Sequence, residues 1–193
     1  RFLAPKLPRG SSWYIGRNHG ISNMINYPLI AWVNYHEREI VPDKAFWLGH
    51  RALKNPLDAW IYQEILFEVK PDIVVEIGNK FGGGTLFLAS ICELIGHGQV
   101  LAVDIDRSKF TPSHQRIDIL TGDCSSSDVI EKVKQKCLDK KVLIIHDADH
   151  SKDAVLRDLR NFSDLVSVDS YLIVEDSIQG VPGYIDPDKD RNV

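Results

Sequence analysis

From residue 57 onward, short continuous apolar runs alternate with longer segments whose apolar residues recur three to four positions apart. The short runs predict buried strands and the longer segments predict amphipathic helices. We expect strands at residues 72–77, 100–104, 117–120, 142–145 and 171–174. We expect helices at residues 57–70, 85–95, 127–138 and 154–166.

Strands that alternate with helices form βαβ units around a parallel sheet. The predicted fold class is therefore α/β, a three-layer Rossmann-like parallel sheet spanning residues 48–193. Residues 1–47 have no clear period and are rich in proline and aromatic residues. This first segment either covers part of the core or forms a substrate lid or an oligomerisation arm, and we expect a homo-oligomer.

Composition narrows the class of protein. The 193 residues carry 23 Lys and Arg against 27 Asp and Glu, a net charge of −4 without a basic cluster, which argues against nucleic-acid binding. No apolar run approaches the roughly 18 residues of a membrane span, so we expect no membrane contact. Three cysteines without a CxxC pair and no visible signal peptide favour a cytoplasmic protein.

Candidate chemistry begins after the first strand, because ligands of parallel sheets bind at the carboxyl ends of the strands. Glu76 is followed by a glycine-rich turn with Gly78, Gly82 and Gly83. Such a turn lets a ligand approach backbone N–H groups, or it is simply a tight turn. Asp104 ends the second strand at the place where NAD-binding and S-adenosylmethionine-binding sheets hold a ribose diol, unless it is only a solvated loop residue.

The third strand is followed by Asp123 and Cys124. A side chain at this place could reach an adenine amino group, and the serines that follow could cap the next helix. Both roles can hold together.

The fourth and fifth strands end in acidic residues, Asp147 on one and Glu175 with Asp176 on the other. Clustered carboxylates repel one another unless a cation neutralises them, and a hard divalent cation such as Mg²⁺ takes oxygen ligands. Scattered surface acids are the alternative. The spacing of His146 and His150 also allows a zinc site, but this segment lies at a strand end rather than on one face of a helix.

These residues together resemble a class I S-adenosylmethionine-dependent methyltransferase, and the closest resemblance is to the cephalosporin hydroxylase/rhamnosyl O-methyltransferase family. The resemblance covers residues 45–183. It rests on Trp47-Leu48-Gly49, Asn55-Pro56-Leu57-Asp58, Lys70-Pro71-Asp72, the Glu76–Gly83 turn and Val174-Glu175-Asp176.

The resemblance implies a Mg²⁺-dependent O-methyltransferase that acts on a hydroxyl of a sugar or another small natural product. Asp147 and His150 would be catalytic, with His150 as the general base. The implied metal ligands are Asp147, Glu175 and Asp176. The implied S-adenosylmethionine-binding residues are Glu76, Gly78, Lys80, Gly82, Gly83, Asp104, Asp123, Cys124 and Asp147.

The sequence departs from the family pattern at its end. Two further strands should follow the fifth, but residues 177–185 have the composition of a loop, so we expect a missing C-terminal hairpin. Three alternatives remain open. A non-catalytic S-adenosylmethionine-binding accessory protein would keep the cofactor residues. An NAD-dependent oxidoreductase has no use for three clustered carboxylates. A glycosyltransferase should open with an apolar strand, which residues 1–47 lack.

Overall fold

The computed structural model describes residues 29–177 and 183–184. Five parallel strands form the central sheet in the order β5-β4-β3-β6-β7. Their bounds are β3 Ile73–Ile77, β4 Gln99–Asp104, β5 Ile117–Thr121, β6 Val142–His146 and β7 Leu172–Val174. The five strands expected from the apolar runs are thereby confirmed.

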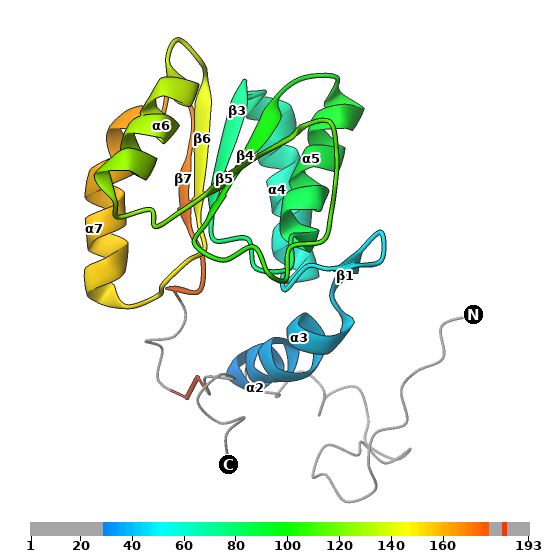
Figure 1. The fold of residues 1–193 in the computed structure, drawn as a ribbon. Coiled ribbons are helices and arrows are strands. Elements are labelled where there is room, and N and C mark those ends of the chain that lie inside the picture. Colours follow the sequence, from blue (N-terminus) through cyan, green and yellow to red (C-terminus); the bar gives the residue numbers. More distant parts are fainter. Residues whose placement is uncertain (1–28, 178–182, 185–193) are drawn as a thin grey trace, which may run out of the picture.

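Four helices cover the two faces of this sheet (Figure 1). Helices α4 (Pro56–Val69) and α5 (Gly83–Ile95) lie on one face. Helices α6 (Ser127–Cys137) and α7 (Lys152–Phe162), the latter continued by the short 3-10 helix η2 (Ser163–Leu165), lie on the other. The three-layer α/β fold predicted from the sequence is confirmed.

Alternation along the strands divides the core into two apolar layers. Val74, Leu143 and Ile145 pack with the α4–α5 face. Val75 and Ile144, which are neighbours of these residues in sequence, pack with the α6–α7 face. Every residue of β3 and β6 is buried, as expected for parallel strands covered on both sides.

Helix α4 buries only some of the apolar residues whose spacing predicts it. Leu57 and Trp60 are 58% and 67% exposed, whereas Tyr62, Leu66 and Val69 are buried. The helix is apolar nearly all round, so the spacing fixes its existence but not its orientation.

The chain before α4 forms small elements beyond the carboxyl ends of the strands (Figure 1). They are helix α2 (Leu29–Tyr35), the π-helix η1 (His36–Ile40), helix α3 (Val41–Lys44), and the strands β1 (Phe46–Trp47) and β2 (His50–Arg51). The sequence did not predict the β1–β2 hairpin. Its turn residues Leu48 and Gly49 both have positive φ, 48° and 85°, which matches the right-handed twist of paired strands.

Several expectations fall wholly or partly outside the described residues. Residues 1–28 make up most of the predicted lid or oligomerisation segment, and residues 178–182 and 185–193 follow the last strand, where the missing hairpin was expected. Among the helices of the described part, none is long and apolar enough to cross a membrane.

Candidate active site

The glycine turn after β3 brings two strand ends into direct contact. Gly78 has φ 90°, and a Cβ there would lie 2.0 Å from the carbonyl oxygen of Asp147. The backbone N–H of Asp147 in turn donates to the carbonyl of Ile77 over 2.7 Å. Gly82, with φ 83°, packs closely against Pro112. Glycine at 78 is therefore required for β3 and β6 to deliver their ends to the same point.

Glu76 holds the turn from inside the protein. Its side chain is 1% exposed and accepts hydrogen bonds from Asn79 Nδ2 over 2.7 Å and from the Thr85 hydroxyl. Burial raises the pKa of Glu76 to about 7, although the nearby Lys54 ammonium and the Thr85 hydrogen bond oppose this rise. Glu76 thus fixes the shape of the turn, and it also lines the larger of the two cavities described below.

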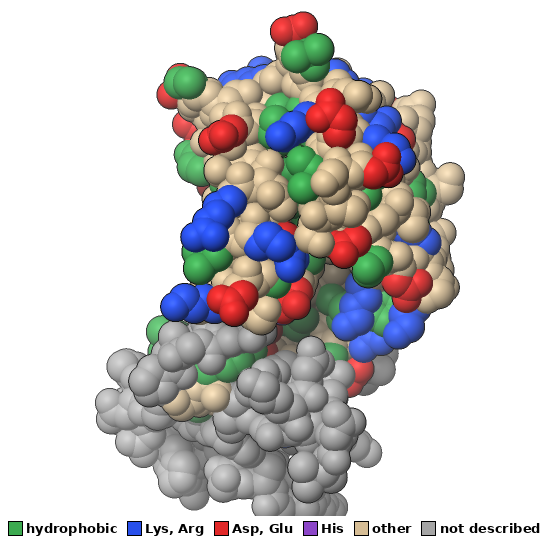
Figure 2. Space-filling model, turned by 60° about the vertical axis from the view of Figure 1, so that its left-hand side comes forward, with side chains coloured by type: hydrophobic (Ala, Val, Ile, Leu, Met, Phe, Trp, Pro, Cys, Tyr) green, Lys and Arg blue, Asp and Glu red, His purple; other side chains and the backbone are tan. Residues whose placement is uncertain are grey.

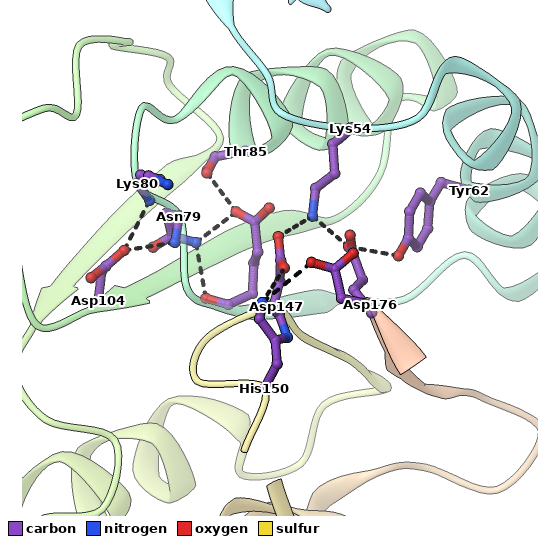
Figure 3. Close-up of polar contacts among 11 residues, drawn as sticks. Lys54, Tyr62, Asn79, Lys80, Thr85, Asp104, Asp147, His150 and Asp176 are labelled. Carbon is purple, nitrogen blue, oxygen red and sulfur yellow. Dashed lines mark hydrogen bonds and ion pairs between the residues drawn. The ribbon is translucent and has the colours of Figure 1, made fainter. Parts of the chain in front are cut away.

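Asp104 at the end of β4 binds the outer side of the same turn (Figure 3). Its Oδ2 accepts from the backbone N–H groups of Asn79 and Lys80 over 2.7 and 2.9 Å, and its Oδ1 accepts from that of Asp106 over 3.1 Å. Burial alone would raise the pKa of Asp104, but these hydrogen bonds and the Arg107 charge lower it overall. Asp104 is therefore a fixed carboxylate facing a cavity of about 580 Å³.

Asp123 and Cys124 line the same cavity from the end of β5. The Asp123 carboxylate accepts from the Ser125 backbone N–H over 2.8 Å, and the Ser126 hydroxyl caps α6 through the N–H of Val129. The helix cap foreseen from the sequence is therefore confirmed, and the same loop lines the cavity, while contact of Asp123 or Cys124 with an adenine stays a prediction.

A buried polar cluster that the sequence did not indicate lies behind Cys124. Asp158 on α7 is 1% exposed and accepts from the Cys124 thiol, and its Oδ2 lies 3.0 Å from His146 Nε2. Burial and the Asp158 charge raise the pKa of the Cys124 thiol to about 12, so it stays protonated. Because His146 is committed to Asp158, the structure does not bring it together with His150, and the zinc interpretation is wrong for the described residues.

The carboxylates after β6 and β7 converge with a histidine (Figure 3). Asp147, His150 and Asp176 each offer a ligand atom within 4.8 Å of the others. His150 Nε2 lies 3.3 Å from Asp176 Oδ2 and 3.9 Å from Asp147 Oδ1. The Nδ1 atom of His150 is buried and has no hydrogen-bond partner among the described residues. This donor set suits a divalent cation.

The third expected metal ligand, Glu175, is placed differently. Its Oε1 accepts from the Lys54 ammonium and from the Tyr62 hydroxyl, the latter over 2.7 Å, instead of joining the group around His150. Lys54 Nζ also lies 2.5 Å from Asp147 Oδ2. The sequence analysis grouped Glu175 with Asp147 and Asp176. In the structure Lys54 lies between Asp147 at the end of β6 and Glu175 at the end of β7.

Lys54 and Tyr62 are the site residues that the sequence analysis missed. Burial alone would lower the pKa of Lys54, but the charges of Asp147, Glu175 and Glu76 raise it well above its usual range. Burial and Glu175 raise the pKa of Tyr62 as well, so its hydroxyl remains a donor. The available signals were a lysine just before the helix cap at Asn55 and a tyrosine within an apolar helix.

Two cavities meet at the end of β6. The smaller one contains Asp104 and Asp123, and a larger one of about 920 Å³ contains Lys54, Tyr62 and His150. Both are lined by the same central residues, Gly78, Asn79, Lys80, Lys109, Asp147 and Ala148. The larger cavity is also lined by Val33, Glu37, Val41 and Pro42 of the elements before the sheet, so this segment forms one of its walls.

The surface over the α6–α7 side carries both signs of charge. Figure 2 shows basic and acidic side chains interspersed there, without a continuous basic field on that face. Nucleic-acid binding would need such a field.

The strand order and the glycine turn define a Rossmann-like α/β fold whose ligand site lies at the carboxyl ends of the strands. A structure of CmcI with Mg and SAM superposes with a TM-score of 0.59 at 23% identity, over 84% of this chain and 68% of that one. A CmcI structure without ligands gives the same TM-score at 22% identity, over 92% and 71%. At these identities the likeness concerns the fold.

Sequence similarity identifies the family. The model of the rhamnosyl O-methyltransferase/CmcI family matches residues 40–192, and the chain belongs to this family. The rhamnosyl O-methyltransferase of Mycobacterium leprae is 37% identical over 137 residues, 68% of this chain and 59% of that protein. The one from Mycobacterium tuberculosis H37Rv is 36% identical over 151 residues, 74% of this chain and 61% of that protein. The chain therefore spans about three fifths of these relatives, and the resemblance found in the sequence is confirmed.

Proposed function

We propose that this chain carries the site of a metal-dependent O-methyltransferase, which transfers the methyl group of S-adenosylmethionine to a hydroxyl of a sugar or another small natural product. The observation that carries the proposal is the junction of two cavities at Asp147. A methyl donor and an acceptor need separate pockets that meet at one point, because the transfer is an in-line displacement that depends on alignment.

The smaller cavity is suited to the donor. Asp104 offers a carboxylate for the ribose hydroxyls, and Asp123 with Cys124 lies where the adenine would extend. The Gly78–Lys80 turn reaches both cavities, which suits the methionine part. Gly82 and Gly83 act by packing, against Pro112 and Arg51 respectively, so their contribution is to shape the turn.

The larger cavity is suited to the acceptor and a divalent cation. Asp147, Glu175 and Asp176 would hold the cation, whose charge would lower the pKa of an acceptor hydroxyl. His150 would take the hydroxyl proton, since a neutral imidazole with a free ring nitrogen is a suitable general base. Residues 29–44 would contribute to acceptor selection as a wall or lid of the larger cavity. Formation of a homo-oligomer through this first segment is part of the same proposal.

Calorimetry with S-adenosylmethionine, NADH and a nucleotide sugar, each with and without Mg²⁺, tests this proposal. We expect S-adenosylmethionine alone among the three to bind. Binding of NADH instead would favour the oxidoreductase, and binding without any transfer to sugar acceptors would favour the accessory protein. Failure of the folded protein to bind S-adenosylmethionine would refute the proposal.

The metal role is tested by Asp147→Ala. We expect this variant to lose Mg²⁺-dependent transfer and to retain binding of S-adenosylmethionine. The control is Asp153→Ala, which removes an exposed carboxylate from the first turn of α7, outside both cavities. Activity that is insensitive to a chelator and to Asp147→Ala would contradict the metal role.

A further inference from the structure

Lys54 lies in the gap between the two strand ends that carry the expected metal ligands. Its ammonium contacts Asp147 Oδ2 at 2.5 Å and also Glu175 Oε1, one carboxylate from β6 and one from β7 (Figure 3). The three side chains are only 10%, 22% and 16% exposed for Lys54, Asp147 and Glu175. The Lys54 ammonium, which carries a single positive charge, thus bridges Asp147 and Glu175, the two carboxylates that a divalent cation would bridge.

The surrounding charges explain why a cation is needed at this place. The acidic side chains that line the larger cavity are Glu37, Asp58, Glu76, Asp147, Glu175 and Asp176. Carboxylates gathered around one cavity repel one another, and an unpaired buried charge such as that of an ionised Glu76 is strongly destabilising. Lys54 therefore stabilises the folded protein when no metal is bound.

The structure also provides room for Lys54 to leave. Residue 84 is a glycine, and a Cβ there would lie 2.9 Å from Lys54 Cε, so glycine at this position leaves space around the lysine stem where it now lies. The cavity of about 920 Å³ lies beside the ammonium, and a four-carbon stem with free rotors can turn into it. The Tyr62 hydroxyl would keep Glu175 oriented after Lys54 had moved, because it donates to the same oxygen over 2.7 Å.

We propose that Lys54 is an internal counter-cation that a divalent metal ion must displace from Asp147 and Glu175 before the metal site is complete. This inference rests on the proposed function. Displacement frees Glu175 to join Asp147 and Asp176, an all-oxygen set that suits Mg²⁺ better than a set containing imidazole. His150 is then left available to take the proton of the acceptor hydroxyl. Lys54 is therefore a positioning residue, because its departure lets the three carboxylates hold the metal while His150 acts as the base.

Metal affinity measured by calorimetry with Mn²⁺ and with Mg²⁺ tests the competition directly. Lys54→Met removes the competing charge and keeps a stem of similar length. We expect it to bind either ion roughly 10- to 100-fold more tightly than the original chain, because two charge-assisted hydrogen bonds no longer have to be broken. The matched control is Lys109→Met, which removes one positive charge from the same cavity without a carboxylate contact within 4.0 Å among the described residues, and it should change affinity much less.

A second measurement uses the unmodified chain and does not depend on the folding of a variant. Lysine acylation followed by mass spectrometry should find Lys54 slow to react without metal and severalfold faster with saturating Mg²⁺, while Lys109 reacts at the same rate in both. An unchanged or slower rate at Lys54 would mean that the ion binds around His150 and leaves the lysine in place, which would overturn the inference.

The outcomes also distinguish this inference from the proposed function. Equal metal affinity in Lys54→Met and the original chain, with S-adenosylmethionine still bound, overturns the displacement alone. Absence of metal binding in both proteins, with S-adenosylmethionine bound, overturns the metal role and the displacement together. Absence of S-adenosylmethionine binding overturns the proposed function itself.

Discussion

The buried carboxyl of Glu76 makes the stability of the fold depend on pH in a direction that can be measured. Its pKa is about 7 in the folded chain, against 4.5 for an ordinary glutamate. The folded state therefore holds this proton more tightly than the unfolded state. Stability from this group is fully present below pH 4.5 and is lost as the pH rises through 7.

The magnitude follows from the two pKa values. With 1.36 kcal/mol for each pH unit between the two titrations, Glu76 should lower the free energy of unfolding by about 2.5 kcal/mol between pH 5 and pH 8. Glu76→Gln removes the titration and keeps an oxygen that can accept from Asn79 and Thr85. The difference in stability between Glu76→Gln and the original chain should therefore shift by about 2.5 kcal/mol in favour of the variant over this range.

Urea unfolding at closely spaced pH values, followed by circular dichroism, provides the measurement. Other acids contribute equally to both proteins and cancel in the difference. Glu68→Gln, an exposed change on α4, is the control and should follow the original chain at every pH. Parallel curves for Glu76→Gln and the original chain would show that the buried carboxyl does not titrate in this range, and the reasoning would be refuted.

Three further predictions concern the cavities. Asp104→Ala should weaken S-adenosylmethionine binding by roughly 10- to 100-fold in calorimetry; unaltered affinity would exclude the ribose role. Gly78→Ala should lower the free energy of unfolding, measured in urea, by about 3 kcal/mol or more, because the new Cβ would overlap Asp147. Gly96 also has a positive φ but has nothing within 4 Å of a Cβ, so Gly96→Ala should lower it by about 1 kcal/mol. Equal losses in the two variants would contradict the close approach at Gly78. His150→Ala should lower turnover about 100-fold or more with near-normal cofactor affinity, and unchanged turnover would eliminate it as the base.

The strands of the sheet could be predicted from the sequence because each one is marked by a short apolar run of neighbouring residues. The run from Asp72 to Ile77 is long and apolar enough to be a buried strand wherever it packs, and β3 spans Ile73–Ile77. Acids such as Asp104 and Asp147 were found for the same reason, since a residue that directly follows a buried strand lies at the ligand-binding edge.

Side-chain direction in α4 and in the segment before it could not be predicted in the same way. Tyr62 points to Glu175, which is 113 positions away in the sequence, and Lys54 reaches Asp147, 93 positions away. The orientation of α4 about its axis decides the Tyr62 contact, and the apolar residues surround the helix too evenly to fix that orientation. Lys54 precedes the helix, in a segment without a periodic pattern. The grouping of Glu175 with the other carboxylates rested on its place at a strand end and on the family resemblance, and neither indicates the lysine that lies between them.

Asp147 links the parts of the site that the sequence presents as separate motifs. Its backbone N–H and carbonyl are held against Ile77 and Gly78, so the end of β6 is packed directly against the glycine turn. Its two carboxylate oxygens face different partners, Oδ2 toward Lys54 and Oδ1 toward His150. A change in what Oδ2 binds therefore alters the charge that the histidine faces across the same carboxylate.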